Sequence, residues 1–238
     1  MEKHYRNAYQ AWDDFARITK ELIINKGFHT IGEIGGGANP LLEAGFIAAN
    51  NLAYRVIDIS AEELARAGAY YVKVQADLEA EDFAAVQQYD FLFAQMTLEH
   101  INKPAVFYRN VYSMLKPGGY AFFFFACDTM LPARVNKWLP ELVSDRILKK
   151  LQPFRKQEHH GKFKAFYRWC KGPTKKNTGR LSKTGLHIIA HTGYFGHSYY
   201  HRFPLLQRLE NWKTSLLLKW PVPRLCSYSQ VLLQKPLQ

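Results

Sequence analysis

Apolar residues along the chain form short continuous runs and longer segments in which they recur every three or four positions. A short apolar run bounded by turn residues is typical of a buried strand, and a spacing of three or four is typical of an amphipathic helix. Their alternation predicts an α/β fold with a mostly parallel sheet. The runs predicted as strands are residues 30–34, 54–58, 71–75, 89–94, 120–125, 186–191 and 228–233.

Several segments are predicted as helices from their spacing and their start signals. Residues 3–26 repeat aromatic and aliphatic positions, which predicts a helix packed over the sheet. Residues 205–217 repeat Leu and Trp in the same way, and we expect these side chains also to pack against the sheet, with contact to a membrane surface as the alternative. Shorter helices are predicted after Ser60, which is a good N-cap residue, and over residues 173–185.

Three consecutive glycines, Gly35 to Gly37, follow the first predicted strand, and Glu33 stands two residues before them. Glycine at a strand-to-helix turn lets a ligand approach the backbone closely, which predicts a nucleotide-like ligand at this edge of the sheet. A dinucleotide fingerprint is excluded because Pro40 stands where the third glycine is needed. A P-loop is excluded because no Gly-Lys-Ser/Thr follows the glycines.

Two carboxylates end the next predicted strands. Asp58 lies roughly 20 residues beyond the glycines, where an acid can bind a ribose diol through its two acceptor oxygens. Asp77, followed by Leu78, ends the third predicted strand. On its own each acid could be an ordinary turn residue, and it is the order and spacing that favour a ligand site.

Two further motifs complete the pattern. Residues 95–101 read Gln-Met-Thr-Leu-Glu-His-Ile, and Pro117-Gly118-Gly119 precedes the fifth predicted strand. With Glu33, the glycines and the two aspartates, they resemble the class I S-adenosylmethionine (SAM) dependent methyltransferases over residues 31–125.

This resemblance implies a three-layer, doubly wound sheet of seven strands. The last strand is antiparallel and lies between the fifth and sixth, and insertions follow strands five and six. It implies SAM as cofactor, with Asp58 on the ribose, Asp77 on the adenine amino group and the amide of Leu78 on the ring. The cofactor-binding residues that it implies are Glu33, Gly35, Gly36, Gly37, Asp58, Ile59, Asp77, Leu78, Ala94 and Gln95.

The length of 238 residues suits one α/β domain covering residues 1–238. We divide it into an N-terminal helix (1–26), a SAM-binding core (27–126), a basic aromatic insertion (127–172) and a C-terminal sheet half with a substrate-side insertion (173–238). The insertion is expected to hold a basic amphipathic helix around Trp138 and Leu142. Three widely separated cysteines form no disulfide framework, and no apolar signal core begins the chain, so a cytoplasmic location is expected.

Charge is distributed unevenly between the two halves of the chain. Residues 1–120 hold 11 Lys/Arg and 15 Asp/Glu, a net of −4, whereas residues 121–238 hold 21 and 5, a net of +16. Such asymmetry indicates an anionic partner, which could be a membrane surface, a nucleic acid or a phosphorylated substrate, unless it is only a solvated surface. A basic aromatic run over residues 162–171 fits any of these partners. Peripheral contact with the inner membrane face is therefore also expected.

Histidine is the residue type best suited to proton transfer at neutral pH. His100 follows the fourth predicted strand, and His191 and His197 lie in a segment rich in hydroxyl groups, so these three are the candidate catalytic bases. Alternatively, His100 braces its helix and the other two are incidental. No metal site is predicted, because His187 and His191 on one strand would lie about 13 Å apart.

These features together predict a SAM-dependent methyltransferase that O-methylates a glycan, a lipid-linked compound or another small metabolite. One alternative is an RNA methyltransferase that uses the basic C-terminal half. The other is a non-catalytic SAM-binding partner protein.

Overall fold

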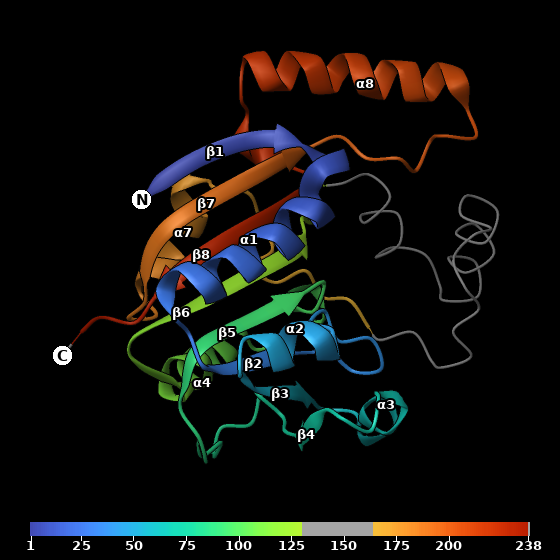
Figure 1. Cartoon of the computed structure of the whole chain (residues 1–238). Helices are drawn as coiled ribbons and strands as arrows, with labels where there is room; N and C mark the ends of the chain where they lie inside the picture. The colour runs from blue at the N-terminus through green and yellow to red at the C-terminus, as the bar shows by residue number, and fades with distance from the viewer. Residues whose placement is uncertain (130–163, 238) are drawn as a thin grey trace.

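The computed structural model describes residues 1–129 and 164–237. Within them, eight strands form one sheet in the order β1-β7-β8-β6-β5-β2-β3-β4 (Figure 1). Neighbouring strands are parallel except that β8 runs antiparallel to both β6 and β7. The strands are β1 (Glu2–Asn7), β2 (Thr30–Ile34), β3 (Ala53–Asp58), β4 (Val72–Gln75), β5 (Tyr89–Gln95), β6 (Leu115–Ala126), β7 (His187–Phe195) and β8 (Tyr228–Gln234).

The seven strands β2 to β8 have the order that the resemblance implied, and the antiparallel last strand is confirmed. β1 is an additional edge strand, and the prediction of a helix over residues 3–26 is wrong for its first residues. β1 pairs in parallel with β7, and the ring of Tyr5 stacks on that of Phe195 at 5.5 Å. The 3-10 helix η1 (Ala8–Gln10) joins β1 to the helix α1 (Ala11–Lys26).

Helices cover both faces of the sheet and complete the three layers. Figure 1 shows α1 and α2 (Ala44–Ala49) on one face and α4 (Pro104–Met114) and α7 (Lys175–Ser182) on the other. On the first face Phe15 stacks on Phe122 with 4.8 Å between ring centroids. On the second face Phe107 packs against Phe123 at 5.8 Å. The aromatic run in β6 is therefore buried from both sides, as its sequence predicts.

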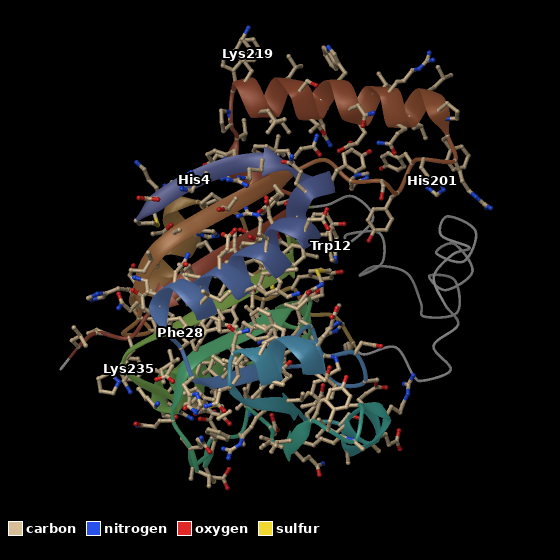
Figure 2. The ribbon with its side chains drawn as sticks, in the orientation of Figure 1. His4, Trp12, Phe28, His201, Lys219 and Lys235 are labelled. Atoms are coloured by element: carbon tan, nitrogen blue, oxygen red, sulfur yellow. The ribbon has the colours of Figure 1, made fainter. Side chains whose placement is uncertain are left out.

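The amino end of α1 reaches the carboxyl edge of the sheet, where the ligand loops lie. Trp12 lies there (Figure 2), and its ring meets those of Phe124 and Tyr228 edge-on at 5.0 and 4.9 Å. The first turn of the helix is thereby fixed to β6 and β8. Trp12 is thus a packing residue at the edge where the ligand loops gather.

The helix α8 (Pro204–Lys219) lies along the β1 and β7 side of the sheet (Figure 1). Its residues that face the body are Glu210, Thr214 and Leu217. The prediction that its Leu and Trp side chains pack against the sheet is wrong for most of them, because they are exposed to solvent. The helix expected around Trp138 lies outside the described residues. Among the described helices, none is both long enough and apolar enough to cross a bilayer.

Candidate functional site

The glycine turn follows β2 at the carboxyl edge of the sheet, and its backbone conformation requires glycine. Gly35 has φ +73° and its amide donates to the carbonyl of Ile57 at 2.7 Å. A Cβ atom on Gly35 would lie 2.3 Å from Thr97 Oγ1, and one on Gly36 would lie 2.9 Å from Glu33 Cδ. Both positions therefore exclude a side chain, and the turn brings backbone close to the end of β5.

Glu33 lies beneath this turn and is 3% exposed. Its carboxylate accepts hydrogen bonds from the amide of Leu41 at 2.9 Å and from the hydroxyl of Tyr54. Burial raises the pKa of Glu33 to about 7, although both hydrogen bonds favour the charged form. Glu33 therefore stabilises the loop after the glycine turn by its hydrogen bond with Leu41. It would influence a bound ligand through the shape of that turn.

Asp58 ends β3 beside the glycine turn. Its Oδ1 accepts the amide of Ser60 at 2.9 Å, and its Oδ2 is 3.2 Å from the position that a Cβ of Gly37 would take. Burial raises the pKa of Asp58 above its ordinary value. Ser60 caps α3 (Ala61–Arg66) as predicted, by accepting the amide of Glu63 at 3.2 Å. Asp58 thus has a half-buried carboxylate beside the backbone of Gly37. The next residue, Ile59, is exposed.

The end of β4 supplies the other predicted acid. Asp77 is exposed, and its Oδ1 accepts the amide of Glu79 at 2.8 Å, which forms a tight turn. Leu78 is buried, and its carbonyl accepts a hydrogen bond from Asn110 Nδ2 on α4 at 3.1 Å. The two residues are therefore held by the turn and by α4, one facing solvent and the other the core.

The chain leaves β5 through a strained residue that no sequence pattern indicated. Ala94 is buried and Gln95 half-buried, and Met96 after them has φ +53°, which is unusual for a residue other than glycine. The amide of Met96 donates to Phe124 at 2.8 Å, and the Thr97 hydroxyl lies 3.3 Å from the carbonyl of Ile34. Such strain persists only where the surroundings fix it, and it is common at functional sites.

Glu99 and His100 lie in the next turn, η2 (Leu98–His100). The carbonyl of Glu99 accepts the amides of Phe166 at 2.7 Å and Tyr167 at 2.9 Å, so the segment after residue 163 lies against η2. The Glu99 side chain is buried, its Oε2 has no hydrogen-bond partner among the described residues, and burial raises its pKa to about 8. His100 is half-buried, with Nδ1 3.1 Å from the carbonyl of Lys164.

The other two candidate bases lie in packed surroundings. His191 is fully buried in β7, with Nε2 2.9 Å from Ser229 Oγ, and burial lowers its pKa to about 4. His197 is buried with Nε2 3.7 Å from Glu210 Oε1 on α8, and burial lowers its pKa although Glu210 opposes this. A base that serves a substrate needs access to it, and of the three histidines only His100 has partial exposure beside the glycine turn and β5.

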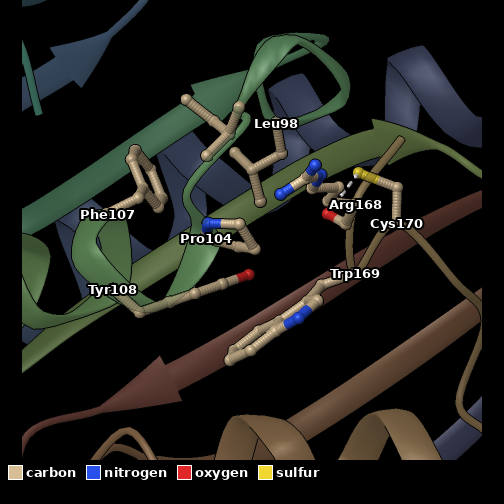
Figure 3. Close-up of a pocket in the computed structure, with 8 residues that line it drawn as sticks. Leu98, Pro104, Phe107, Tyr108, Arg168, Trp169 and Cys170 are labelled. Carbon is tan, nitrogen blue, oxygen red and sulfur yellow. Dashed lines mark hydrogen bonds between the residues drawn. The ribbon is translucent and has the colours of Figure 1, made fainter. Parts of the chain in front are cut away.

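Two cavities lie on the α4 side of the sheet. The first, about 10 Å³, is a gap between η2, α4 and the segment with Arg168, Trp169 and Cys170 (Figure 3), and it has room for roughly one water molecule. The second measures about 350 Å³. Its lining combines cationic and aromatic side chains, namely Arg109, Tyr112, Trp169, Arg180 and Lys183. We call this second cavity the basic groove.

No group of three or more His, Cys, Asp or Glu side chains in residues 1–129 and 164–237 is arranged to hold a metal ion. The carboxyl edge itself combines a side-chain-free turn, an acid on each of the next two strands and a histidine. That set offers hydrogen-bond acceptors for a diol and an amino group, and it suits a nucleoside better than a metal ion.

Comparison with known proteins agrees with this geometry. Residues 33–123 match the family model of the methyltransferase domain. A SAM-dependent methyltransferase from Clostridium acetobutylicum is 10% identical, with a TM-score of 0.54 over 94% of this chain and 92% of that one. A SAM-dependent methyltransferase from Archaeoglobus fulgidus is 13% identical, with a TM-score of 0.52 over 96% and 100%.

The N-methyltransferase NodS from Bradyrhizobium japonicum, solved with S-adenosyl-L-homocysteine, is 14% identical, with a TM-score of 0.51 over 97% of this chain and 89% of that one. Likeness at these identities is a likeness of fold. A comparison with curated protein sequences gives no match.

Proposed function

We propose that the chain, whose residues 33–123 match the methyltransferase-domain model, is a class I SAM-dependent methyltransferase that methylates a hydroxyl group of a glycan, a lipid-linked compound or another small metabolite. The observation that supports this most is one juxtaposition at the carboxyl edge of the sheet. There the glycine turn and Asp58 lie beside the turn that carries His100.

The residues present fit SAM. A Cβ atom on Gly35 or Gly36 would collide with Thr97 or Glu33, so the turn is built of bare backbone that can face the methionine end of the cofactor. The half-buried carboxylate of Asp58 suits the ribose diol, and Asp77 with Leu78 suits the adenine ring. Ala94 and Gln95 offer backbone at the end of β5. Bound SAM supplies a methyl group on a sulfonium that needs no further activation.

The chain's own residues must then position the acceptor and remove its proton. A carbonyl oxygen only accepts hydrogen bonds, so the contact with Lys164 requires that His100 Nδ1 donates. In the neutral ring Nε2 is then the basic nitrogen, and the proton of the acceptor hydroxyl moves to it as the oxygen attacks. Holding the two reacting groups in line lowers the activation free energy by roughly 7–11 kcal/mol in favourable cases.

Replacement of His100 by Ala tests the proposed base. We expect a rate loss of roughly 100- to 10,000-fold, with SAM affinity unchanged. His187→Ala removes an exposed histidine of β7 and is the matched control. The measurement is S-adenosyl-L-homocysteine release with glycan, lipid-linked, amine and RNA acceptors. If the His100→Ala enzyme methylated a hydroxyl at the normal rate, His100 would not be the base. Catalysis would then rest on the proximity of the two reacting groups alone.

An RNA methyltransferase is the second candidate, because the basic groove favours it. Arg109, Arg180 and Lys183 could neutralise phosphates there while Trp169 and Tyr112 stack on bases. Methylation of RNA alone in the acceptor panel would replace the first proposal by this one.

A further inference from the structure

The outer face of α8 is an apolar stripe exposed to solvent. Leu205 is 74% exposed, Leu209 62%, Trp212 65% and Trp220, the C-cap, 60%. These positions are separated by four, three and eight residues, so at 3.6 residues per turn they lie on one face of the helix. Four large apolar side chains therefore face solvent together, which is unusual on a soluble surface.

The opposite face of α8 fixes the helix to the body, so the stripe cannot simply turn inward. Glu210 is buried and pairs with Lys213 at 2.6 Å and with His197 at 3.7 Å. Thr214 is buried against the turn at Gly196, where a Cβ would lie 2.7 Å from Thr214 Oγ1. Rotating the stripe toward the sheet would expose this ion pair and break the contact at Gly196.

Basic side chains border the stripe. Residues 202–225 contain five Lys or Arg, and their only acid is the buried Glu210. The five are Arg202, Arg208, Lys213, Lys219 and Arg224. Lys219 points away from the body (Figure 2), and its Nζ lies 4.7 Å from the ring centroid of Trp220. This combination of an apolar face, tryptophans and flanking cations is typical of a helix in the plane of a membrane interface.

We propose that the outer face of α8 docks the enzyme on an anionic lipid surface. The apolar stripe would enter the boundary between headgroups and acyl chains, and the flanking cations Arg208 and Lys219 would contact anionic headgroups. The inference rests on the proposed function only where it favours a lipid-linked acceptor, since docking itself needs neither SAM nor acceptor.

A second copy of the chain fits this face less well. A helix of 16 residues is about 24 Å long and about 10 Å wide, so its face offers on the order of 240 Å², whereas a standard interface buries about 800 Å² per partner. The chain also carries a net charge of +12, which opposes self-association and favours an anionic surface.

The test is sedimentation of the full-length chain with vesicles of phosphatidylcholine, with and without about one third phosphatidylglycerol. We expect partition onto the anionic vesicles, with a blue shift of tryptophan emission. Leu205→Ser/Leu209→Ser should reduce partition by at least about tenfold, because it removes two leucines that the lipid would bury. Arg208→Gln/Lys219→Gln should reduce it by roughly 30-fold through lost charge.

Matched controls make comparable substitutions elsewhere. Val72→Ser/Val86→Ser removes exposed apolar side chains in β4 and in the segment that follows it, and Lys175→Gln/Lys176→Gln removes exposed charges on α7. Both should partition like the unchanged chain, and circular dichroism checks that every variant is folded. Calorimetry measures SAM affinity and so tests the proposed function separately. The α8 variants should bind SAM with unchanged affinity.

Three outcomes would overturn the inference. The first is a chain that binds no vesicles, and the second is partition that the α8 variants leave unchanged. The third is a lipid-free dimer that Leu205→Ser/Leu209→Ser dissociates, which would assign the face to a second copy. Loss of SAM binding with intact vesicle partition would instead contradict the proposed function and leave docking supported.

Discussion

Asp58 is the residue whose replacement tests the cofactor site most directly. Its carboxylate is half-buried beside Gly37, where it can reach a ribose diol. We expect Asp58→Ala to weaken SAM binding by about 1.5–3 kcal/mol, the usual contribution of hydrogen bonds to a charged group. Asp82→Ala removes an exposed acid and should leave the affinity unchanged. Calorimetry that gives one affinity for both variants would exclude the assigned role.

Glu99 makes the stability of the fold depend on pH. Burial raises its pKa from 4.5 to about 8, so between these values the folded state holds a proton that the unfolded state has lost. The free energy of unfolding therefore falls as pH rises through this window, by about 1.4 kcal/mol for each unit of pKa shift at most. Glu99→Gln keeps the shape and removes the ionisation.

The expected result is a Glu99→Gln variant that is more stable than the unchanged chain above pH 8 and similar to it near pH 4.5. Urea unfolding at both pH values measures this. Glu62→Gln, which changes an exposed acid of α3, should give no such difference. A Glu99→Gln chain that is less stable at high pH would indicate that the carboxylate has a charged partner when folded.

Sequence spacing predicted the acids and glycines of the site but not the state of Glu99 or of Met96. Asp58 and the glycine turn are positioned by neighbouring strands, so short-range order suffices to place them. The surroundings of Glu99 include Phe166 and Tyr167, more than sixty residues away, whose amides donate to its carbonyl. The positive φ of Met96 depends on the way β6 and Thr97 confine it. Contacts between distant segments leave no periodic pattern to predict them.

At the scale of the element, the glycine turn after β2 is the most sensitive segment. Gly35→Ala would combine φ +73° with a Cβ 2.3 Å from Thr97 Oγ1, so the turn or the end of β5 must shift. We expect a stability loss of about 1–3 kcal/mol and a loss of SAM binding. Gly45→Ala in α2 meets no atom within 4 Å and should stabilise the fold by about 0.5–1 kcal/mol.

Thermal unfolding and calorimetry on these two glycine variants separate strain at the turn from a general effect of the added methyl group. If Gly35→Ala and Gly45→Ala changed stability and SAM binding equally, the backbone conformation of the turn would not require glycine.

Two elements differ from their sequence-based predictions for related reasons. Apolar spacing runs without a break from Tyr5 into α1, but β1 gains more by pairing with β7, almost two hundred residues away. The apolar side chains of α8 do recur at helical spacing. Such spacing identifies an apolar face of the helix, but it does not say which surface packs against that face. Charge on both sides of the stripe was the only sign in the sequence that this surface is not the sheet.

At the scale of the whole molecule, positive charge gathers on two separate surfaces. The basic groove between α4 and α7 and the outer face of α8 draw on different side chains. Lipid docking and RNA binding can therefore be distinguished by substitution as well as by salt, although salt weakens both.

The corresponding prediction concerns Arg109→Gln/Arg180→Gln/Lys183→Gln, which neutralises the basic groove. We expect vesicle partition within about twofold of the unchanged chain, because α8 is intact. Any affinity for structured RNA should fall, and the slope of log affinity against log salt should decrease by about two, since each lost phosphate contact contributes roughly 0.7–0.9. Lys20→Gln/Lys26→Gln on α1, across the sheet, should leave both readouts nearly unchanged. If the groove variant lost vesicle partition instead, the lipid surface would contact the α4 and α7 side, and α8 would not be the docking element.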